Sequence, residues 1–100
     1  MTNKLVLSGM IVKAPVISQS PAGIVHCHLV LEHKSMQSEA DLQRQVYCRI
    51  QVVVSGERSR AFTQNLVEGM YVEVSGFIAY QQSRNGLNKI ILHADNIKKI

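Results

Sequence analysis

Residues 46–69, VYCRIQVVVSGERSRAFTQNLVEG, contain the change of pattern that decides the fold. In the first part of this stretch, apolar side chains recur at every second position, as on a strand with one buried face. The inward set is Val46, Cys48, Ile50, Val52 and Val54, and the outward set includes Tyr47, Arg49 and Gln51.

The period changes after Val54, and residues 57–68 place apolar side chains at helical spacing, namely Ala61, Phe62, Leu66 and Val67. Ser55 or Gly56 is expected to cap the start of this helix, and Gly69 stands where a C-terminal cap glycine belongs. The stretch therefore predicts a strand over 46–54 followed by a short helix.

Two further strands precede this segment. Leu5, Leu7 and Ile11 alternate, and Gly9 lies where a side chain would otherwise project, which predicts a strand with a sharp bend. Pro15 and the turn residues 18–23 break this pattern. A second strand is predicted over residues 24–34, with Cys27, Leu29 and Leu31 inward, and the polar residues 35–45 are expected to form a long mobile loop.

Two strands are also predicted after the helix. Residues 70–80 place Val72, Val74, Ile78 and Tyr80 on one side, and residues 89–97 are expected to bury Ile90, Leu92 and Ala94. The pair Asn85-Gly86 between them is a strong hairpin signal. Outward apolar residues that need a cover, from a second subunit or a partner, are Val30, Phe77 and Ile91.

The order strand, strand, strand, helix, strand, strand matches an all-β, five-stranded OB-fold, a Greek-key barrel with one short helix between the third and fourth strands. Another small barrel, or an open sheet with one helix, is the alternative. The chain has 100 residues, which fits one domain over residues 1–100. A hydrophobic content of 46% with 18% charged residues is typical of a folded globular chain.

Several classes of function lack their usual motifs. No paired C-x-x-C ligands occur, and His26 with His28 would supply too few ligands, so neither a metal nor a cofactor is expected. Cys27 and Cys48 are expected to be free thiols. No nucleophile elbow, zinc-protease motif or phosphate-binding loop is present, so the chain is predicted to be no enzyme, without catalytic residues. It also lacks a long apolar run and a signal-peptide pattern, which favours the cytoplasm.

The charge is positive, with 11 Lys and Arg against 7 Asp and Glu. In an OB-fold, the second and third strands and two flanking loops form the binding face. Cations that follow phosphates and a ring that stacks on bases suit a single-strand groove. The candidate residues for binding single-stranded DNA are Lys34, Arg44, Tyr47, Arg49, Arg84 and Lys89. The alternative is that these cations are ordinary surface residues that keep the protein soluble and that Tyr47 covers a strand face.

Short segments spread over almost the whole chain carry a family resemblance, including 5–9 (LVLSG), 20–24 (SPAGI), 31–33 (LEH), 85–87 (NGL) and 92–94 (LHA). Together, in this order, they resemble the family of primosomal replication protein N (primosomal protein B), a bacterial relative of single-stranded-DNA-binding protein. The resemblance implies an OB-fold homodimer without catalytic activity that binds single-stranded DNA in the replication-restart primosome. The implied partners are the restart helicase and further primosomal proteins, and the implied DNA contacts are Lys34, Arg44, Tyr47, Arg84 and Lys89.

The sequence departs from that family pattern at four positions. Leu42 stands where an aromatic residue is expected, Tyr47 where a tryptophan is expected, and Ser18 and Gln82 where lysines are expected. We therefore expect weaker and more salt-sensitive DNA binding. A protein–protein adaptor with only residual nucleic-acid binding is the alternative function. An RNA-binding protein of the cold-shock type is disfavoured because only 5% of the residues are aromatic.

Overall fold

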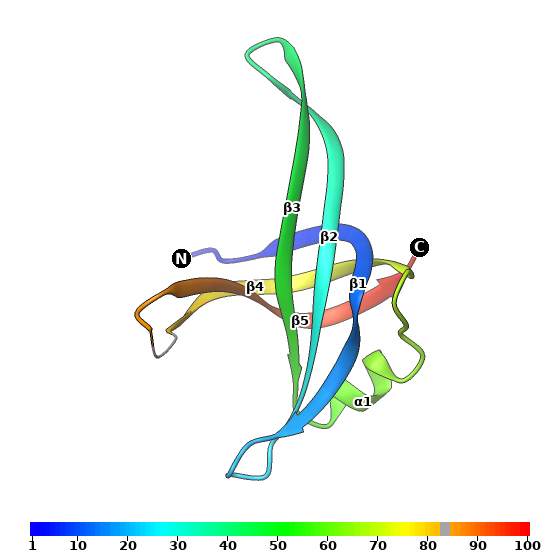
Figure 1. Cartoon of the computed structure of the whole chain (residues 1–100), viewed down its shortest axis with the longest axis vertical. Coiled ribbons are helices and arrows are strands. Elements are labelled where there is room, and N and C mark those ends of the chain that lie inside the picture. Colours follow the sequence, from blue (N-terminus) through cyan, green and yellow to red (C-terminus); the bar gives the residue numbers. More distant parts are fainter. Residues whose placement is uncertain (83–84) are drawn as a thin grey trace.

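The computed structural model describes residues 1–82 and 85–100, apart from the side chains of Arg58 and Phe62. These residues form a closed five-stranded barrel with the strand order β1-β2-β3-β5-β4 (Figure 1). The elements are β1 (Leu5–Gln19), β2 (Val25–Glu39), β3 (Leu42–Ser55), α1 (Arg58–Thr63), β4 (Tyr71–Gln82) and β5 (Asn88–Lys99). The parallel pairing of β3 with β5, with the helix between β3 and β4, confirms the OB-fold.

Strand β1 bends so that it can pair with two neighbours. Its first part pairs with β4, from Leu5 to Met10, and its second part pairs with β2. Gly9 lies at the change-over, where an added Cβ atom would come 2.2 Å from the carbonyl oxygen of Glu32. The predicted bend is confirmed. The predicted break at Pro15 is wrong, because β1 continues to Gln19. Pro15 lies at a shift of the β1–β2 register between Lys13 and Val16, where its missing N–H costs no ladder hydrogen bond.

The core lies between the strands and consists of Ile11, Leu29, Leu31, Val52, Val72, Val74 and Leu92. The predicted burial of Ile90 is wrong, since Ile90 is 48% exposed and Ile91 only 2%. Ile91 is flanked by Gln51 of β3 and Ala79 of β4, whereas Ile90 pairs with exposed Tyr80 where the β4–β5 hairpin leaves the barrel.

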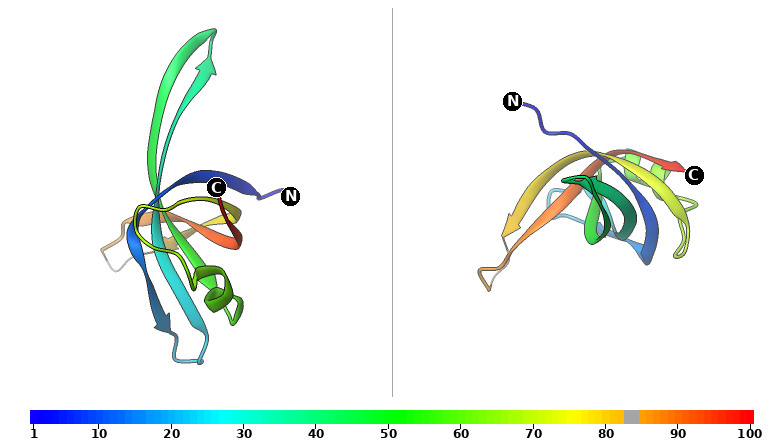
Figure 2. Two further views of the ribbon diagram at one scale, coloured as in Figure 1. Left: turned by 90° about the vertical axis from the view of Figure 1, so that its right-hand side faces the viewer. Right: turned by 90° about the horizontal axis from the view of Figure 1, so that it is seen from above.

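The predicted loop over residues 35–45 is also wrong. Strands β2 and β3 continue to Glu39 and Leu42, and Ala40 and Asp41 connect them with positive φ angles of 52° and 64°. The resulting hairpin stands clear of the barrel in Figure 1 and in the left view of Figure 2. Because both of its faces meet solvent there, its sequence lacks the apolar alternation of a half-buried strand.

Helix α1 is shorter than the predicted 57–68 and spans 6 residues. Glu57 is its N-cap and Gln64 its C-cap, so the capping roles expected of Ser55, Gly56 and Gly69 are wrong. Gly69, with φ +91°, instead precedes β4 and donates its N–H to the carbonyl of Ile11 at 2.7 Å. Leu66 packs on the core without being helical, which explains the apparent helical stripe. The side chain of Phe62 in that stripe lies outside the described residues.

Candidate nucleic-acid interface

Four side chains meet on the outward face of β2 and β3, and we call them the Glu32 cluster: Glu32, Lys34, Tyr47 and Arg49. The antiparallel register places Glu32 opposite Arg49 and Lys34 opposite Tyr47. Directly opposed residues on a strand pair are close enough for their side chains to interact. The outward placement predicted for Lys34, Tyr47 and Arg49 is therefore confirmed.

The Glu32 carboxylate is the centre of this cluster. Its Oε2 atom accepts hydrogen bonds from the Tyr47 hydroxyl at 3.2 Å and from Arg49 Nε at 3.1 Å. Arg49 Nη2 lies 3.0 Å from the same oxygen, and Lys34 Nζ lies 3.6 Å from Oε1. The Glu32 side chain is 11% exposed, whereas those of Lys34 and Arg49 are 63% and 58% exposed.

The groups of the cluster shift the pKa values of Glu32 and Arg49 so that the ionised forms of both are favoured. Burial alone would raise the pKa of Glu32, but the hydrogen bonds from Tyr47 and Arg49 and the charges of Lys34 and Arg49 outweigh it, so the pKa is lowered. The hydrogen bond with Tyr47, followed by that with Glu32, raises the pKa of Arg49. Glu32 thus stays ionised near neutral pH, and two cations against one anion leave the cluster with a net charge of +1.

Two shallow hollows follow one another along the outward side of β3. One, of about 510 Å³, is lined by Cys48, Arg49, Ile50, Gln51, Lys89 and Ile90. The other, of about 330 Å³, is lined by His26, His28, Val53, Ser55, Tyr80, Gln81, Ile91 and His93. Lys89 of β5 and Arg49 of β3 thus line the same hollow. We call the Glu32 cluster together with these two hollows the β3 groove.

The second hollow has aromatic side chains at its border. The ring of Phe77 stacks on that of His93, with 4.9 Å between the ring centroids. His26 and His28 are held by hydroxyl groups, at 2.7 Å from Ser55 and 3.1 Å from Ser18. Among the described residues, no group of three or more His, Cys, Asp or Glu is placed to hold a metal ion.

Among the described candidates, Arg44 lies away from the β3 groove. Arg44 is three positions before Tyr47, so it projects from the other face of the hairpin, where it forms an ion pair with Glu39 at 2.9 Å. Arg84 lies outside the described residues. Leu42, expected to be aromatic in the family, is 68% exposed near the hairpin turn.

Sequence reasoning missed two members of the β3 groove. The alternating pattern does not single out Glu32 as a site residue, although its spacing of two from Lys34 places both side chains on one strand face. Tyr80 was placed on the side of Val72 and Val74, yet it is 73% exposed. Its neighbour Gln81-Gln82, a polar pair before a hairpin signal, could have indicated that the strand leaves the barrel there.

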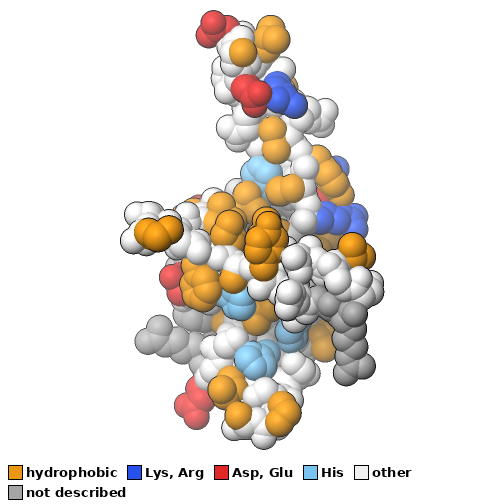
Figure 3. All heavy atoms as spheres, turned by 90° about the vertical axis from the view of Figure 1, so that its left-hand side faces the viewer, with side chains coloured by type: hydrophobic (Ala, Val, Ile, Leu, Met, Phe, Trp, Pro, Cys, Tyr) orange, Lys and Arg blue, Asp and Glu red, His pale blue; other side chains and the backbone are white. Residues whose placement is uncertain are grey.

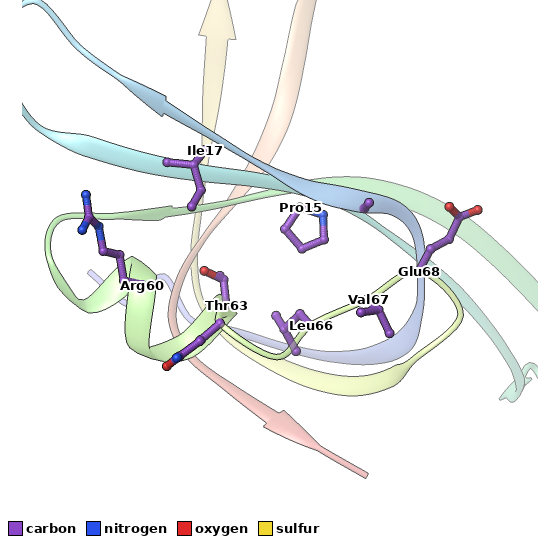
Figure 4. A pocket seen from close by; sticks show the side chains of 9 residues that line it. Pro15, Ile17, Arg60, Thr63, Leu66, Val67 and Glu68 are labelled. Atoms are coloured by element: carbon purple, nitrogen blue, oxygen red, sulfur yellow. The ribbon is translucent and has the colours of Figure 1, made fainter.

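A larger hollow, of about 790 Å³, lies between β1 and the helical side of the barrel (Figure 4). Figure 4 shows Pro15 and Ile17 of β1 across from Leu66 and Val67, with Arg60 and Glu68 at its margins. This hollow is mainly apolar and is separate from the Glu32 cluster. Within the described part of the chain, no helix combines the length and the apolar character of a membrane span.

Comparison with known proteins places the chain among single-strand binding proteins. A family model described as "Another single-strand binding protein family" matches residues 3–96. The replication restart protein PriB of Vibrio cholerae is 62% identical over 100 residues, covering 100% of both chains. PriB of Yersinia pseudotuberculosis is 52% identical over 99 residues, covering 99% of this chain and 94% of the relative.

Solved structures share the fold at lower identity. PriB of Ralstonia solanacearum superposes with a TM-score of 0.81 at 21% identity, covering 99% of this chain and 98% of the other. The single-stranded DNA binding protein of Thermus aquaticus gives a TM-score of 0.82 at 20% identity, covering 99% of this chain and 50% of the other. Both comparisons agree with the OB-fold barrel.

Proposed function

The chain belongs to the PriB family of replication restart proteins, within a family of single-strand binding proteins, and we propose that it binds single-stranded DNA along the β3 groove. The observation that carries this proposal is the row of Tyr47, Arg49 and Lys89 along one side of β3, with an exposed ring and two cations. Single-strand grooves combine these two kinds of side chain, because cations follow the backbone and rings stack on bases.

The proposed binding is mainly electrostatic. Stacking on one ring contributes roughly 1–3 kcal/mol, which alone corresponds to weak binding. Lys34, Arg49 and Lys89 supply positive charge, and Glu32 cancels part of it. Arg44 and Arg84 are the further DNA-binding candidates that the sequence offers. The affinity should therefore depend strongly on salt.

We further propose a non-enzymatic accessory role in the replication-restart primosome, in the cytoplasm. The chain would bridge single-stranded DNA and the restart helicase, and it would help to recruit further primosomal proteins. The names of the relatives support work in replication restart. No cofactor is part of this proposal.

A homodimer is part of the same proposal. Val6 of β1 and Phe77 of β4 are about half exposed, at 53% and 49%. Figure 3 shows hydrophobic side chains gathered in the middle of one face, among histidine side chains. A second subunit could cover such residues. Light scattering at micromolar concentration should give about twice 11.2 kDa. A mass equal to that of one chain would contradict the homodimer.

The direct test of the DNA-binding candidates is charge removal. The double variant Arg84→Ala with Lys89→Ala should weaken the binding of oligo-dT and of other single strands to a similar extent. It should also reduce the steepness of the salt slope, which is the slope of log affinity against log salt concentration, by about 0.7 for each lost phosphate contact. Lys99→Ala, near the far end of β5, is the matched control and should leave the affinity within about twofold. An unchanged affinity in the double variant would show that DNA binds elsewhere.

The second candidate function is a protein–protein adaptor with residual nucleic-acid binding. The apolar hollow in Figure 4, lined by Ile17, Leu66 and Val67, favours it, because exposed apolar surface is typical of partner contacts. If the double variant above no longer binds DNA but still associates with the restart helicase, that result would support the adaptor function instead.

A further inference from the structure

We propose that Glu32 is a positioning residue, whose carboxylate fixes the Tyr47 ring as a preformed stacking surface through the tyrosine hydroxyl. This inference rests on the proposed function. It concerns how the β3 groove of this chain is built, and it assigns a role to an acidic residue in a site that binds an anion.

The Tyr47 hydroxyl has two hydrogen-bond partners. It donates to Glu32 Oε2 at 3.2 Å and accepts from Arg49 Nε at 2.8 Å. Arg49 Nε also donates to Glu32 Oε2 at 3.1 Å, so the three groups close a triangle of hydrogen bonds. Hydrogen bonds that involve charged groups are stronger than neutral ones. The outer end of the ring is therefore held at a fixed place.

Glu32 lies at a rigid position in the sheet, from which it can hold the Tyr47 hydroxyl. It lies on a strand with neighbours on both sides, opposite Met10 of β1 and Arg49 of β3. Its side chain is 11% exposed, whereas Tyr47 is 53% exposed. A nearly buried carboxylate on a paired strand thus orders a side chain that would otherwise be mobile on the surface.

The two faces of the Tyr47 ring have different surroundings. Lys34 Nζ lies over one face, 5.8 Å from the ring centroid, and Glu32 Oε1 holds that ammonium at 3.6 Å. The opposite face is the one we assign to a base. Because the ring is ordered before DNA arrives, binding avoids the cost of immobilising it, which corresponds to about a threefold to tenfold gain in affinity.

A double-mutant cycle tests this anchor. Tyr47→Phe keeps the ring and removes the hydroxyl, so we expect it to weaken oligo-dT binding about threefold to tenfold. In the Glu32→Ala background the same change should cost less than about twofold. The hydroxyl has then lost its carboxylate partner, and Arg49, its other partner, is no longer held by Glu32. Equal costs in both backgrounds would overturn the inference. Tyr71→Phe, which removes another exposed hydroxyl, is the control and should leave binding unchanged.

Glu32→Gln serves as the conservative variant and as the replacement if Glu32→Ala does not fold. Its amide oxygen can still accept from the tyrosine, so Tyr47→Phe should again weaken binding measurably in this background. A cost below twofold there, with full folding shown by urea denaturation, would contradict anchoring through the hydroxyl.

A measurement without DNA separates the anchor from the binding site. The chain has no Trp and 3 Tyr, so in a Tyr71→Phe and Tyr80→Phe background the emission reports Tyr47 alone. Glu32→Ala should raise its quenching by acrylamide and lower its anisotropy, and no change would contradict the anchor. If Tyr47→Ala leaves DNA binding unaltered, the proposed site at Tyr47 fails, whatever the emission shows.

Discussion

Gly9 shows how a single residue can set the path of a strand. An alanine there would place its Cβ atom 2.2 Å from the backbone oxygen of Glu32, and backbone atoms cannot move aside as a flexible side chain can. The bend of β1, and with it the closure of the barrel against β4, therefore depends on the missing side chain.

We predict that Gly9→Ala destabilises the protein by more than about 3 kcal/mol, a loss typical of severe backbone or packing conflicts. Urea denaturation followed by circular dichroism measures this loss. Ser8→Ala, at the adjacent half-buried position, should cost less than about 1.5 kcal/mol. Equal stability of Gly9→Ala and the parent protein would show that β1 can shift away from Glu32.

The two thiols should differ in reactivity. Cys27 is fully buried, and burial raises the pKa of its thiol while a hydrogen bond with Thr63 opposes this weakly. Since the thiolate is the reactive form, a thiol reagent should modify half-buried Cys48 first and Cys27 only on unfolding. Modification of both thiols at one rate in the native protein would contradict this burial.

The raised pKa of Cys27 also predicts a pH dependence of stability. The unfolded chain ionises this thiol first, near its ordinary pKa of about 9.0, so the contribution is intact below that pH and is lost as the pH rises through the folded pKa. Cys27→Ser should reduce the loss of stability between about pH 8 and pH 10, measured by urea denaturation. An unaltered pH profile would argue against this contribution.

At the scale of the elements, the β2–β3 hairpin is the feature that extends the candidate site beyond the barrel. Its turn places Ala40 and Asp41 at positive φ, which asparagine and glycine adopt more easily than alanine. We therefore expect this turn to be less stable than the same turn with Asn and Gly at these two positions.

We predict that Ala40→Asn with Asp41→Gly slows amide hydrogen exchange in residues 36–45 about fivefold, which corresponds to about 1 kcal/mol of relieved backbone strain. Amides of the core strand around Val52 should exchange as before. Unchanged exchange in the hairpin would show that its turn is not the weak point.

The elements that could be predicted from the sequence are those with one buried face. The inward residues Cys27, Leu29 and Leu31 alternate because they face the core, so their placement followed from the pattern. Where strands leave the barrel, the alternation of apolar and polar residues carries no information on which side faces inward. This applies to residues 39–42, Tyr80 and Ile90. The candidate site follows the same rule. The outward side of Tyr47 and Arg49 was predictable, but their shared hydrogen bonds to Glu32 depend on the pairing of β2 with β3.

At the scale of the whole molecule, the net charge of +4 is modest for a protein that binds a polyanion. In the Glu32 cluster, one carboxylate already engages both cations. About three phosphate contacts, from Lys34, Arg49 and Lys89, would give a salt slope near −2 for single strands. A slope near zero would mean that binding is not electrostatic, and Lys89→Ala should make the slope shallower by about 0.7.

The central claim is that the β3 groove binds single-stranded DNA. Fluorescence anisotropy with labelled oligo-dT, an RNA of matching sequence and a duplex, at low and at near-physiological salt, tests it most directly. The account predicts tighter binding of the single DNA strand than of the RNA or the duplex, with an affinity that falls as salt rises. Absence of binding at low salt, or equal binding of all three ligands, would contradict it and would favour an adaptor that acts through protein partners.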